Sequence, residues 1–260
     1  MDMYDGLAEA YDEIFPVNPA TLVRLGALGV GRASRVLDVG CATGGHVLEL
    51  ARRGAAALGV DPAETLVVRA RELAAQSASS GDFPPGTAVP RFGVAGMLDF
   101  ASFTGAGTFD ALLCLGNTLP HLGSSAELAT FLEAAAAALD DGGLLVLQVL
   151  DYGTLSARRP ERLSPVETGR WRFERALRWL EDGRVEFSTR LSSPDGTLTR
   201  EGSTILTPFT PATLASALAE AGFEGIEARG GWSGKSFEPG VDPVVVFEAR
   251  KRTRGSPARP

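Results

Sequence analysis

Residues 36–45, VLDVGCATGG, join an apolar run with a single acidic residue, Asp38, and a turn of small residues. A strand, a Gly-rich turn and a helix in succession place backbone N–H groups at the carboxyl edge of a parallel sheet, where ligands bind. Gly40, Ala42 and Gly44 lack bulk, so we expect a cofactor to lie against the main chain there. The turn also half-satisfies the dinucleotide spacing G-x-G-x-x-G, so by itself it leaves the nucleotide cofactor open.

Two carboxylates narrow the choice of cofactor. Asp38 stands two residues before Gly40, where it can accept a hydrogen bond from a ligand ammonium group but would repel a pyrophosphate. Asp61 ends the next apolar run, LGVDP, at the position from which a carboxylate grips ribose hydroxyls. A cofactor with a ribose, an amino-acid end and no phosphate fits both residues, which favours S-adenosylmethionine.

The elements that must hold these residues follow from the alternation of short apolar runs with amphipathic stretches, which is typical of a parallel sheet covered by helices. Strands are predicted at residues 35–40, 56–61, 89–94, 109–116, 142–151, 225–230 and 244–250. Helices are predicted at residues 44–54, 63–77, 124–143 and 210–223, the third of them stopping at Gly142 and Gly143. The last strand follows only a loop, so we expect it to run antiparallel in an α/β, doubly wound, seven-stranded Rossmann-like sheet.

An inserted antiparallel β-element is predicted at residues 156–207, where the pattern changes to three strands joined at Asp182-Gly183 and Asp195-Gly196. Alternation places Arg175 on one face with four large apolar side chains: Trp171, Phe173, Leu177 and Trp179. A charge among aromatic residues needs a partner, so Arg175 is a candidate for binding a substrate carboxylate, although internal pairing is the simpler alternative. The predicted organisation is lid helices (1–30), a cofactor domain (31–155 and 208–250), the substrate cap (156–207) and a disordered basic tail (251–260).

The sequence VLDVGCATGGHVLELARRG, followed by ALGVDPAETLV, resembles the cofactor signature of class I S-adenosylmethionine-dependent methyltransferases. YDGLAEAYD resembles the N-terminal helix that closes over the cofactor in that family. CLGNTLPHL and LQVLDY resemble segments of the branch that holds glycine N-methyltransferases and amino-sugar N-methyltransferases. Two departures stand out: Ala42 replaces the central glycine of the motif, and Gly96 replaces the acidic residue that usually contacts the adenine amine. Backbone groups of Met97 can still meet the adenine edge, while Asp99 stands three residues late.

The resemblance, with the two carboxylates above, implies a set of site residues. For the acceptor it implies contacts from Asn117 and His121, beside the Arg175 that alternation suggests, and for catalysis roles for His121, Asn117 and Tyr11, with His121 as the candidate proton acceptor. The alternative for His121 is a histidine hydrogen-bonded for structure. The expected cofactor contacts are Tyr4, Asp38, Gly40, Cys41, Ala42, Gly44, Asp61, Pro62, Met97, Leu98, Leu115, Gly116 and Thr118.

Composition bounds the remaining possibilities. The 260 residues carry a formal net charge of −7, which disfavours nucleic acid as a partner. Cys41 and Cys114 lie in apolar runs, without zinc spacing or a disulfide framework, so we expect reduced thiols, no metal and a cytoplasmic protein. The N-terminal stretch does not read as a signal peptide and no apolar run is long enough to span a membrane, so no membrane partner is expected. A monomer or a homodimer is expected.

These observations predict an S-adenosylmethionine-dependent methyltransferase that acts on a small-molecule acceptor, at an amine nitrogen, by direct in-line displacement. Methylation of oxygen or carbon remains open. A nicotinamide-dependent oxidoreductase is the alternative of another class, but tyrosines occur only at 4, 11 and 152 and lysines only at 235 and 251, so no Tyr-x-x-x-Lys pair exists. A non-catalytic cofactor-binding module is the third alternative.

Overall fold

The structure, a computed structural model, describes residues 6–253 and contains a seven-stranded sheet in the order β10-β11-β5-β4-β1-β2-β3. All neighbouring strands pair in parallel except β11, which is antiparallel to both β10 and β5 and confirms the prediction for the last strand. The strands are β1 (Arg35–Val39), β2 (Ala56–Asp61), β3 (Arg91–Val94), β4 (Phe109–Cys114), β5 (Leu139–Leu150), β10 (Phe223–Gly230) and β11 (Val244–Lys251). The strand β11 includes Lys251, so the predicted tail starts one residue too early, and residues 254–260 lie outside the described part.

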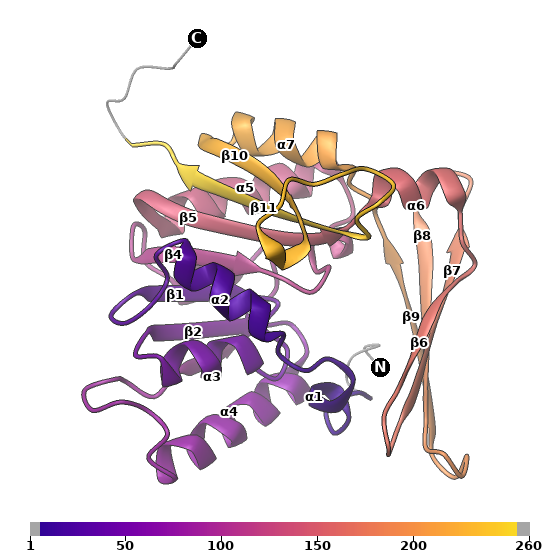
Figure 1. Ribbon diagram of the computed structural model, residues 1–260, viewed down its shortest axis with the longest axis horizontal. Coiled ribbons are helices and arrows are strands. Elements are labelled where there is room, and N and C mark those ends of the chain that lie inside the picture. The colour runs from indigo at the N-terminus through magenta and orange to yellow at the C-terminus, as the bar shows by residue number, and fades with distance from the viewer. Residues whose placement is uncertain (1–5, 254–260) are drawn as a thin grey trace.

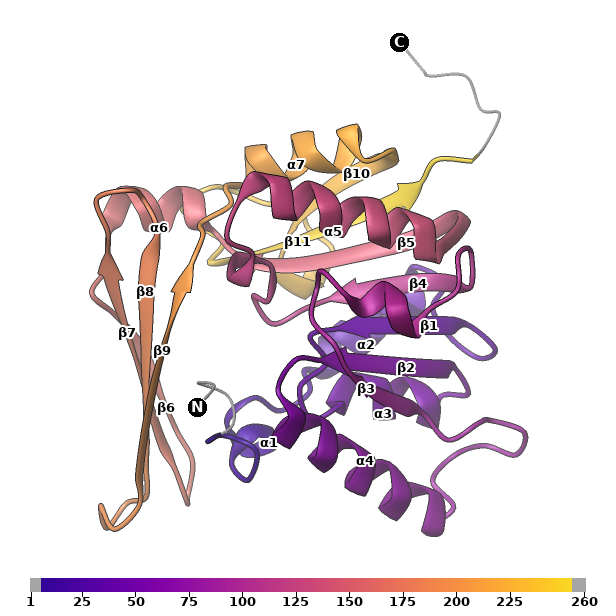
Figure 2. The ribbon, with the colours of Figure 1, turned by 180° about the vertical axis from the view of Figure 1, so that it is seen from behind.

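Helices cover both faces of this sheet, as the predicted alternation requires (Figures 1 and 2). On one face lie α2 (Pro19–Ala27), α3 (Gly45–Arg52) and α4 (Glu64–Ser79), and on the other lie α5 (Ser125–Ala138) and α7 (Pro211–Glu220). The apolar stripes of α5 and α7 share one large buried cluster with the strands, for example Phe131 and Leu214 with Leu37. Burial of these side chains on both faces makes the sheet a rigid platform for its carboxyl edge.

The predicted end of the third helix is wrong. Helix α5 ends at Ala138, and β5 begins at once with Leu139, so Gly142 and Gly143 lie inside the strand. The register with β4 shifts at this place, between Phe109 and Ala111, and Gly142 has φ +76°. The two glycines therefore form an irregularity within a long strand instead of a helix stop.

A second sheet of four antiparallel strands, β6-β7-β8-β9, stands beside the carboxyl ends of the first (Figure 1). Its strands are β6 (Arg162–Glu167), β7 (Arg172–Trp179), β8 (Val185–Ser192) and β9 (Thr199–Leu206), and α6 (Tyr152–Arg158) leads into it from β5. The sequence predicted three strands and missed β6. This edge strand contains Pro165 and a register shift between Leu163 and Val166, and it lacks the alternation that marks a strand.

Candidate active site

The turn after β1 takes a left-handed backbone at three places, with φ +81° at Gly40, +49° at Ala42 and +79° at Gly44. A Cβ on Gly40 would lie 2.5 Å from Thr118 Cγ2, and a Cβ on Gly44 would lie 2.4 Å from Phe92 Cε1. Side chains of the protein itself therefore fill the space on the Cβ side of these two glycines, and contact between the backbone of the turn and a cofactor stays a prediction. Ala42 tolerates its conformation at a cost of about 1 kcal/mol.

Asp38, at the end of β1, is 2% exposed, and its Oδ1 has no hydrogen-bond partner within the described residues. Burial, and secondarily the charge of Asp61, raise the pKa of Asp38 to about 7. A buried carboxylate without a donor is costly, because the protein supplies nothing in place of water. A ligand ammonium group would supply the missing hydrogen-bond donor, whereas a phosphate would be repelled by the carboxylate.

Asp61 ends β2, and backbone groups hold its carboxylate in place. Oδ2 accepts a hydrogen bond from Ala42 N and Oδ1 accepts one from Ala63 N, both at 2.9 Å. These two backbone donors fix the direction in which the carboxylate faces. Asp38 and Asp61 together fit the ammonium and ribose ends of S-adenosylmethionine.

The predicted contacts that follow β2 and β3 lie along the same edge. Pro62 and Leu98 are exposed, the leucine to 49%, while Met97 packs partly against the core. Leu98 is a large, exposed apolar side chain at the edge where a cofactor is expected. A planar base bound there would cover it.

The segment after β4 carries the predicted acceptor contacts. Asn117 has φ +67°, its Nδ2 donates to the Tyr152 hydroxyl at 3.0 Å, and its Oδ1 accepts from Leu150 N at 3.0 Å. The side chain thus joins the ends of β4 and β5, and contact between Asn117 and the acceptor stays a prediction. Tyr152 is 2% exposed, and burial raises its pKa to about 12. The sequence did not single out Tyr152, because no local pattern reveals a partner 35 residues away.

Leu115, Gly116, Thr118 and His121 belong to the same segment. Leu115 is buried, a Cβ on Gly116 would meet open space, and Thr118 Oγ1 donates to Leu115 O at 2.7 Å. His121 closes the short helix η2 (Leu119–His121), and Thr207 N donates to Pro120 O at 2.7 Å. His121 is therefore next to the point where the second sheet rejoins the first, and its role as a proton acceptor stays a prediction.

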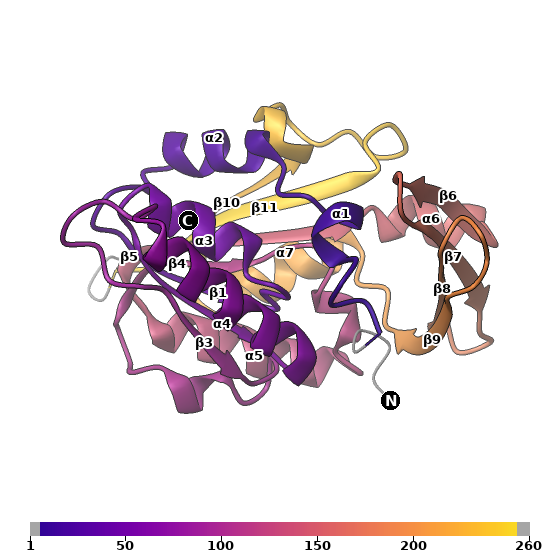
Figure 3. The ribbon, with the colours of Figure 1, turned by 90° about the horizontal axis from the view of Figure 1, so that it is seen from below.

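The N-terminal segment packs against both the cofactor turn and the second sheet. In α1 (Tyr11–Ile14), Asp12 Oδ1 accepts a hydrogen bond from the Thr43 hydroxyl at 2.5 Å. Tyr11 packs against the buried cluster of Ala42, Ala63 and Leu66, and Phe15 meets the Phe173 ring edge-on at 5.4 Å. Figure 3 shows α1 between the two sheets. Tyr4 lies outside the described residues.

The face of the second sheet toward α1 is apolar at Trp171, Phe173 and Leu191, which pack against Leu7 and Ile14. Arg175 pairs in register with Thr189 in the next strand. Its Nη2 donates to Ser164 O at 2.6 Å, but its buried Nε has no acceptor, and burial lowers the pKa of Arg175. Its binding of a substrate carboxylate stays a prediction.

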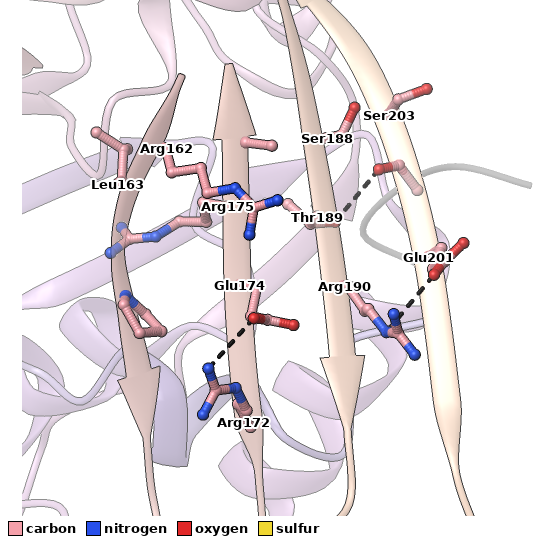
Figure 4. A pocket seen from close by; sticks show the side chains of 13 residues that line it. Arg162, Leu163, Arg172, Glu174, Arg175, Ser188, Thr189, Arg190, Glu201 and Ser203 are labelled. Carbon is pink, nitrogen blue, oxygen red and sulfur yellow. Dashed lines mark hydrogen bonds and ion pairs between the residues drawn. The ribbon is translucent and has the colours of Figure 1, made fainter. Parts of the chain in front are cut away.

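A pocket of about 710 Å³ lies on the second sheet (Figure 4). One register row of that sheet, Glu174, Arg190 and Glu201, lines it, and Arg190 pairs with Glu201 at 3.6 Å. No residue of the seven-stranded sheet lines it. Arg175, the predicted contact for a substrate carboxylate, is among the residues that line this pocket.

Other reactive groups offer no competing chemistry. Cys41 and Cys114 are buried free thiols whose pKa is raised by burial, so neither is an activated nucleophile. Burial lowers the pKa of His46 to about 4. Within residues 6–253, no group of His, Cys, Asp and Glu side chains is placed to hold a metal ion, and no helix is long and apolar enough to cross a membrane.

Comparison with known proteins agrees with this fold. The family described as "Methyltransferase domain" matches residues 7–228, and none of the curated proteins matches the chain. The structure of the CcbJ methyltransferase from Streptomyces caelestis shares 21% identity over 97% of this chain and 99% of that chain, with a TM-score of 0.79. CalS10 from Micromonospora echinaspora, an amino pentose methyltransferase solved with bound S-adenosylmethionine, shares 26% identity over 94% and 95%, with a TM-score of 0.62. The sugar N-methyltransferase KedS8 from a Streptoalloteichus species shares 24% identity over 96% and 93%, with a TM-score of 0.65.

The fold and the carboxylate-bearing edge define an α/β methyltransferase, and the chain belongs to the methyltransferase-domain family. It is an enzyme whose cofactor is S-adenosylmethionine.

Proposed function

We propose that the protein transfers a methyl group from S-adenosylmethionine to an amine nitrogen of a small-molecule acceptor. The observation that carries the proposal is the position of the second sheet. The chain enters this sheet from the carboxyl edge of the large sheet and returns to the same edge. Helix α6 leaves directly from Tyr152, and Thr207 returns onto Pro120 at 2.7 Å. A sheet held this closely over the edge favours a small enclosed acceptor over a macromolecule.

The assignment of nitrogen draws on two further points. CalS10 and KedS8, which share this architecture, are described as acting on an amino pentose and on a sugar nitrogen. The net charge of −7 suits an acceptor that arrives as an ammonium ion.

When bound, S-adenosylmethionine supplies a methyl group already activated by a sulfonium. The work left to the protein is to bind, to orient and to exclude water. Asp38 would accept a hydrogen bond from the ammonium group of the cofactor, and Asp61 would accept from the ribose. The α1 segment, whose Tyr11 packs against the cluster that contains Ala42, would shield this edge from solvent.

A protonated amine has no lone pair to attack with, so the acceptor must lose a proton before transfer. His121 is the side chain proposed to take it. Asn117, held by Leu150 and Tyr152, would shape the acceptor side of the edge. The contacts of Tyr11, Leu115, Gly116 and Thr118 with the ligands belong to the same proposal, as does binding of an acceptor carboxylate by Arg175.

The test is product analysis with methyl-labelled S-adenosylmethionine and matched sets of amines, amino sugars, phenols and carboxylates. We expect label on nitrogen, with turnover rising with pH as free amine accumulates. If only phenols or carboxylates were labelled, the methylated atom would be oxygen instead of nitrogen, and the protein would still be a methyltransferase. Label only on RNA or protein would contradict the small acceptor as well. His121→Gln should alter the pH profile, whereas Glu133→Gln on the exposed face of α5 should not.

A further inference from the structure

Both connections between the two sheets contact the segment that follows β4. Where the chain leaves β5, Leu150 N donates a hydrogen bond to Asn117 Oδ1, and Asn117 Nδ2 donates one to the hydroxyl of Tyr152, the first residue of α6, both at 3.0 Å. Where the chain returns from β9, Thr207 N donates to Pro120 O at 2.7 Å. The segment with the predicted acceptor contacts is therefore held at the base of the second sheet, and Asn117 is the side chain held at the exit connection.

The chemistry of its partners fixes the orientation of the Asn117 amide. A backbone N–H can only donate, so Leu150 N must face the amide oxygen. The amide nitrogen then faces Tyr152, whose hydroxyl oxygen accepts. Nδ2 carries a second hydrogen, and no other acceptor within residues 6–253 bonds to this nitrogen. This second N–H is therefore available to a ligand.

Tyr152 is itself firmly placed. Its side chain is buried, and the residue before it, Asp151, accepts hydrogen bonds from Thr154 N at 3.1 Å and from Gly240 N at 3.2 Å, which anchors the start of α6. Asn117 has φ +67°, a left-handed backbone that costs energy and persists only where the surroundings hold it. The bonds of the Asn117 side chain to Tyr152 and Leu150 supply part of that hold.

The space beside Asn117 leaves room for movement of its side chain. A Cβ built on the preceding residue, Gly116, would meet nothing within 4 Å. Without the Tyr152 hydroxyl, Asn117 Nδ2 would face the edge of a buried ring, where no water replaces the lost acceptor. The side chain would then rotate to find another partner, and the direction of its second N–H would be lost.

We propose that Tyr152 is a positioning residue for methyl transfer: its hydroxyl holds the Asn117 amide so that the second N–H of that amide faces the methyl acceptor. Tyr152 acts through Asn117 and is not itself a catalytic residue. The inference rests on the proposed function in placing the acceptor beside Asn117, but it does not require that the methylated atom be nitrogen.

The first test measures the bond itself, without cofactor or acceptor. Asparagine occurs only at positions 18 and 117, so protein labelled with ¹⁵N at the asparagine side chains gives two amide groups in a ¹H–¹⁵N spectrum. In Tyr152→Phe, which keeps the ring, we expect the Asn117 amide protons to exchange with water about tenfold faster. The Asn18 amide, whose Oδ1 accepts from Ala20 N at the start of α2, is the internal control and should not change.

The second test asks whether Tyr152 acts through Asn117 in the reaction. The probe is methyl-labelled S-adenosylmethionine with the small molecule that becomes labelled in the product analysis. Tyr152→Phe should lower kcat/KM for that molecule by about tenfold, while the affinity for S-adenosyl-L-homocysteine stays unchanged. In the Asn117→Ala background, Tyr152→Phe should add little further loss, because the side chain through which it acts is absent.

Ser77→Ala is the matched control. It removes another buried hydroxyl, which accepts from Arg52 Nη2 at 2.8 Å on α4, and it should alter neither the exchange of the Asn117 amide nor the rate of transfer. Unchanged exchange in Tyr152→Phe would overturn the proposal. Losses in kcat/KM that add fully in the double variant would overturn it too, because they would reduce Tyr152 to a support of the fold.

The outcomes also separate this inference from the proposed function. Label on nitrogen together with additive losses would contradict the role of Tyr152 alone. Label on oxygen together with non-additive losses would contradict the amine acceptor alone. If no small molecule of the panel is labelled, the positioning role and the proposed function fail together.

Discussion

The Thr43 hydroxyl donates a hydrogen bond to Asp12 Oδ1 at 2.5 Å, although 31 residues separate them in sequence. Thr43 belongs to the turn after β1, and Asp12 belongs to α1, which also packs on the second sheet through Ile14 and Phe15. The cofactor turn, the N-terminal segment and the inserted sheet are thus mechanically joined. Displacement of α1 must break contacts with both.

Removal of the Thr43 hydroxyl should loosen α1. Thr43→Val keeps the size of the side chain and leaves Asp12 without this donor, at a cost of about 1–2 kcal/mol in local stability. Hydrogen exchange of the amides at residues 10–15 should accelerate about tenfold, while the strands of the large sheet exchange as before. Thr130→Val on α5, where the hydroxyl bonds only its own helix, is the matched control. Equal exchange at residues 10–15 in Thr43→Val and the unsubstituted protein would show that the bond does not hold α1.

Asp38 should make the stability of the cofactor-free protein depend on pH. Its pKa rises from 3.8 to about 7 on folding, so the folded protein binds this proton more tightly than the unfolded chain. The stabilisation is complete below the unfolded pKa and is lost as pH rises through about 7. Urea unfolding at pH values between 4 and 8 should show a falling free energy of unfolding that is flatter in Asp38→Asn. Parallel curves for the two proteins would refute the assignment.

The same residue should couple cofactor binding to pH. A bound ammonium group favours the carboxylate form of Asp38, so binding should release a proton below about pH 7. Calorimetry of S-adenosyl-L-homocysteine in buffers of different ionisation enthalpy measures that release. We expect affinity to rise with pH up to neutrality, and Asp38→Asn to bind weakly with no such rise.

Asp61→Ala should weaken cofactor binding by about 1–3 kcal/mol, because ribose hydroxyls lose a charged acceptor. The change also frees Ala42 N and Ala63 N, so the folded state needs a separate check by circular dichroism and by urea unfolding. The thermal shift caused by saturating S-adenosyl-L-homocysteine should shrink in the variant. A correctly folded variant with unchanged affinity would remove the ribose assignment.

Gly44→Ala should destabilise the protein by roughly 2–4 kcal/mol. The new Cβ would clash with the Phe92 ring, and alanine is strained in the left-handed backbone conformation of this residue. Gly116→Ala isolates the backbone part, because its φ of +69° is also left-handed but its Cβ would meet open space. We expect about 1 kcal/mol for that control. Similar losses of unfolding free energy in both variants would mean that packing against Phe92 contributes little.

Much of this protein follows from local pattern. Alternating apolar runs and amphipathic stretches predicted the parallel sheet, because a strand buried on both faces must be apolar throughout. The end positions of Asp38 and Asp61 followed from the strands themselves. The loop before β11 predicted its antiparallel course, because a parallel return needs a long crossover.

Tertiary structure alone decided what fills the space around those residues. Only the folded chain sets Thr118 against Gly40 and Phe92 against Gly44, and only it leaves Asp38 Oδ1 without a donor. The partners of Asn117, Tyr152 and Leu150, lie more than 30 residues along the chain, and no short-range pattern encodes such a contact. The edge strand β6 contains a proline and a shifted register, and its apolar and polar residues alternate too little to predict a strand from sequence. It forms because β7 pairs with it through backbone hydrogen bonds. Composition and period determine which faces are buried, whereas the pairing of particular atoms depends on distances that exist only after the chain has folded.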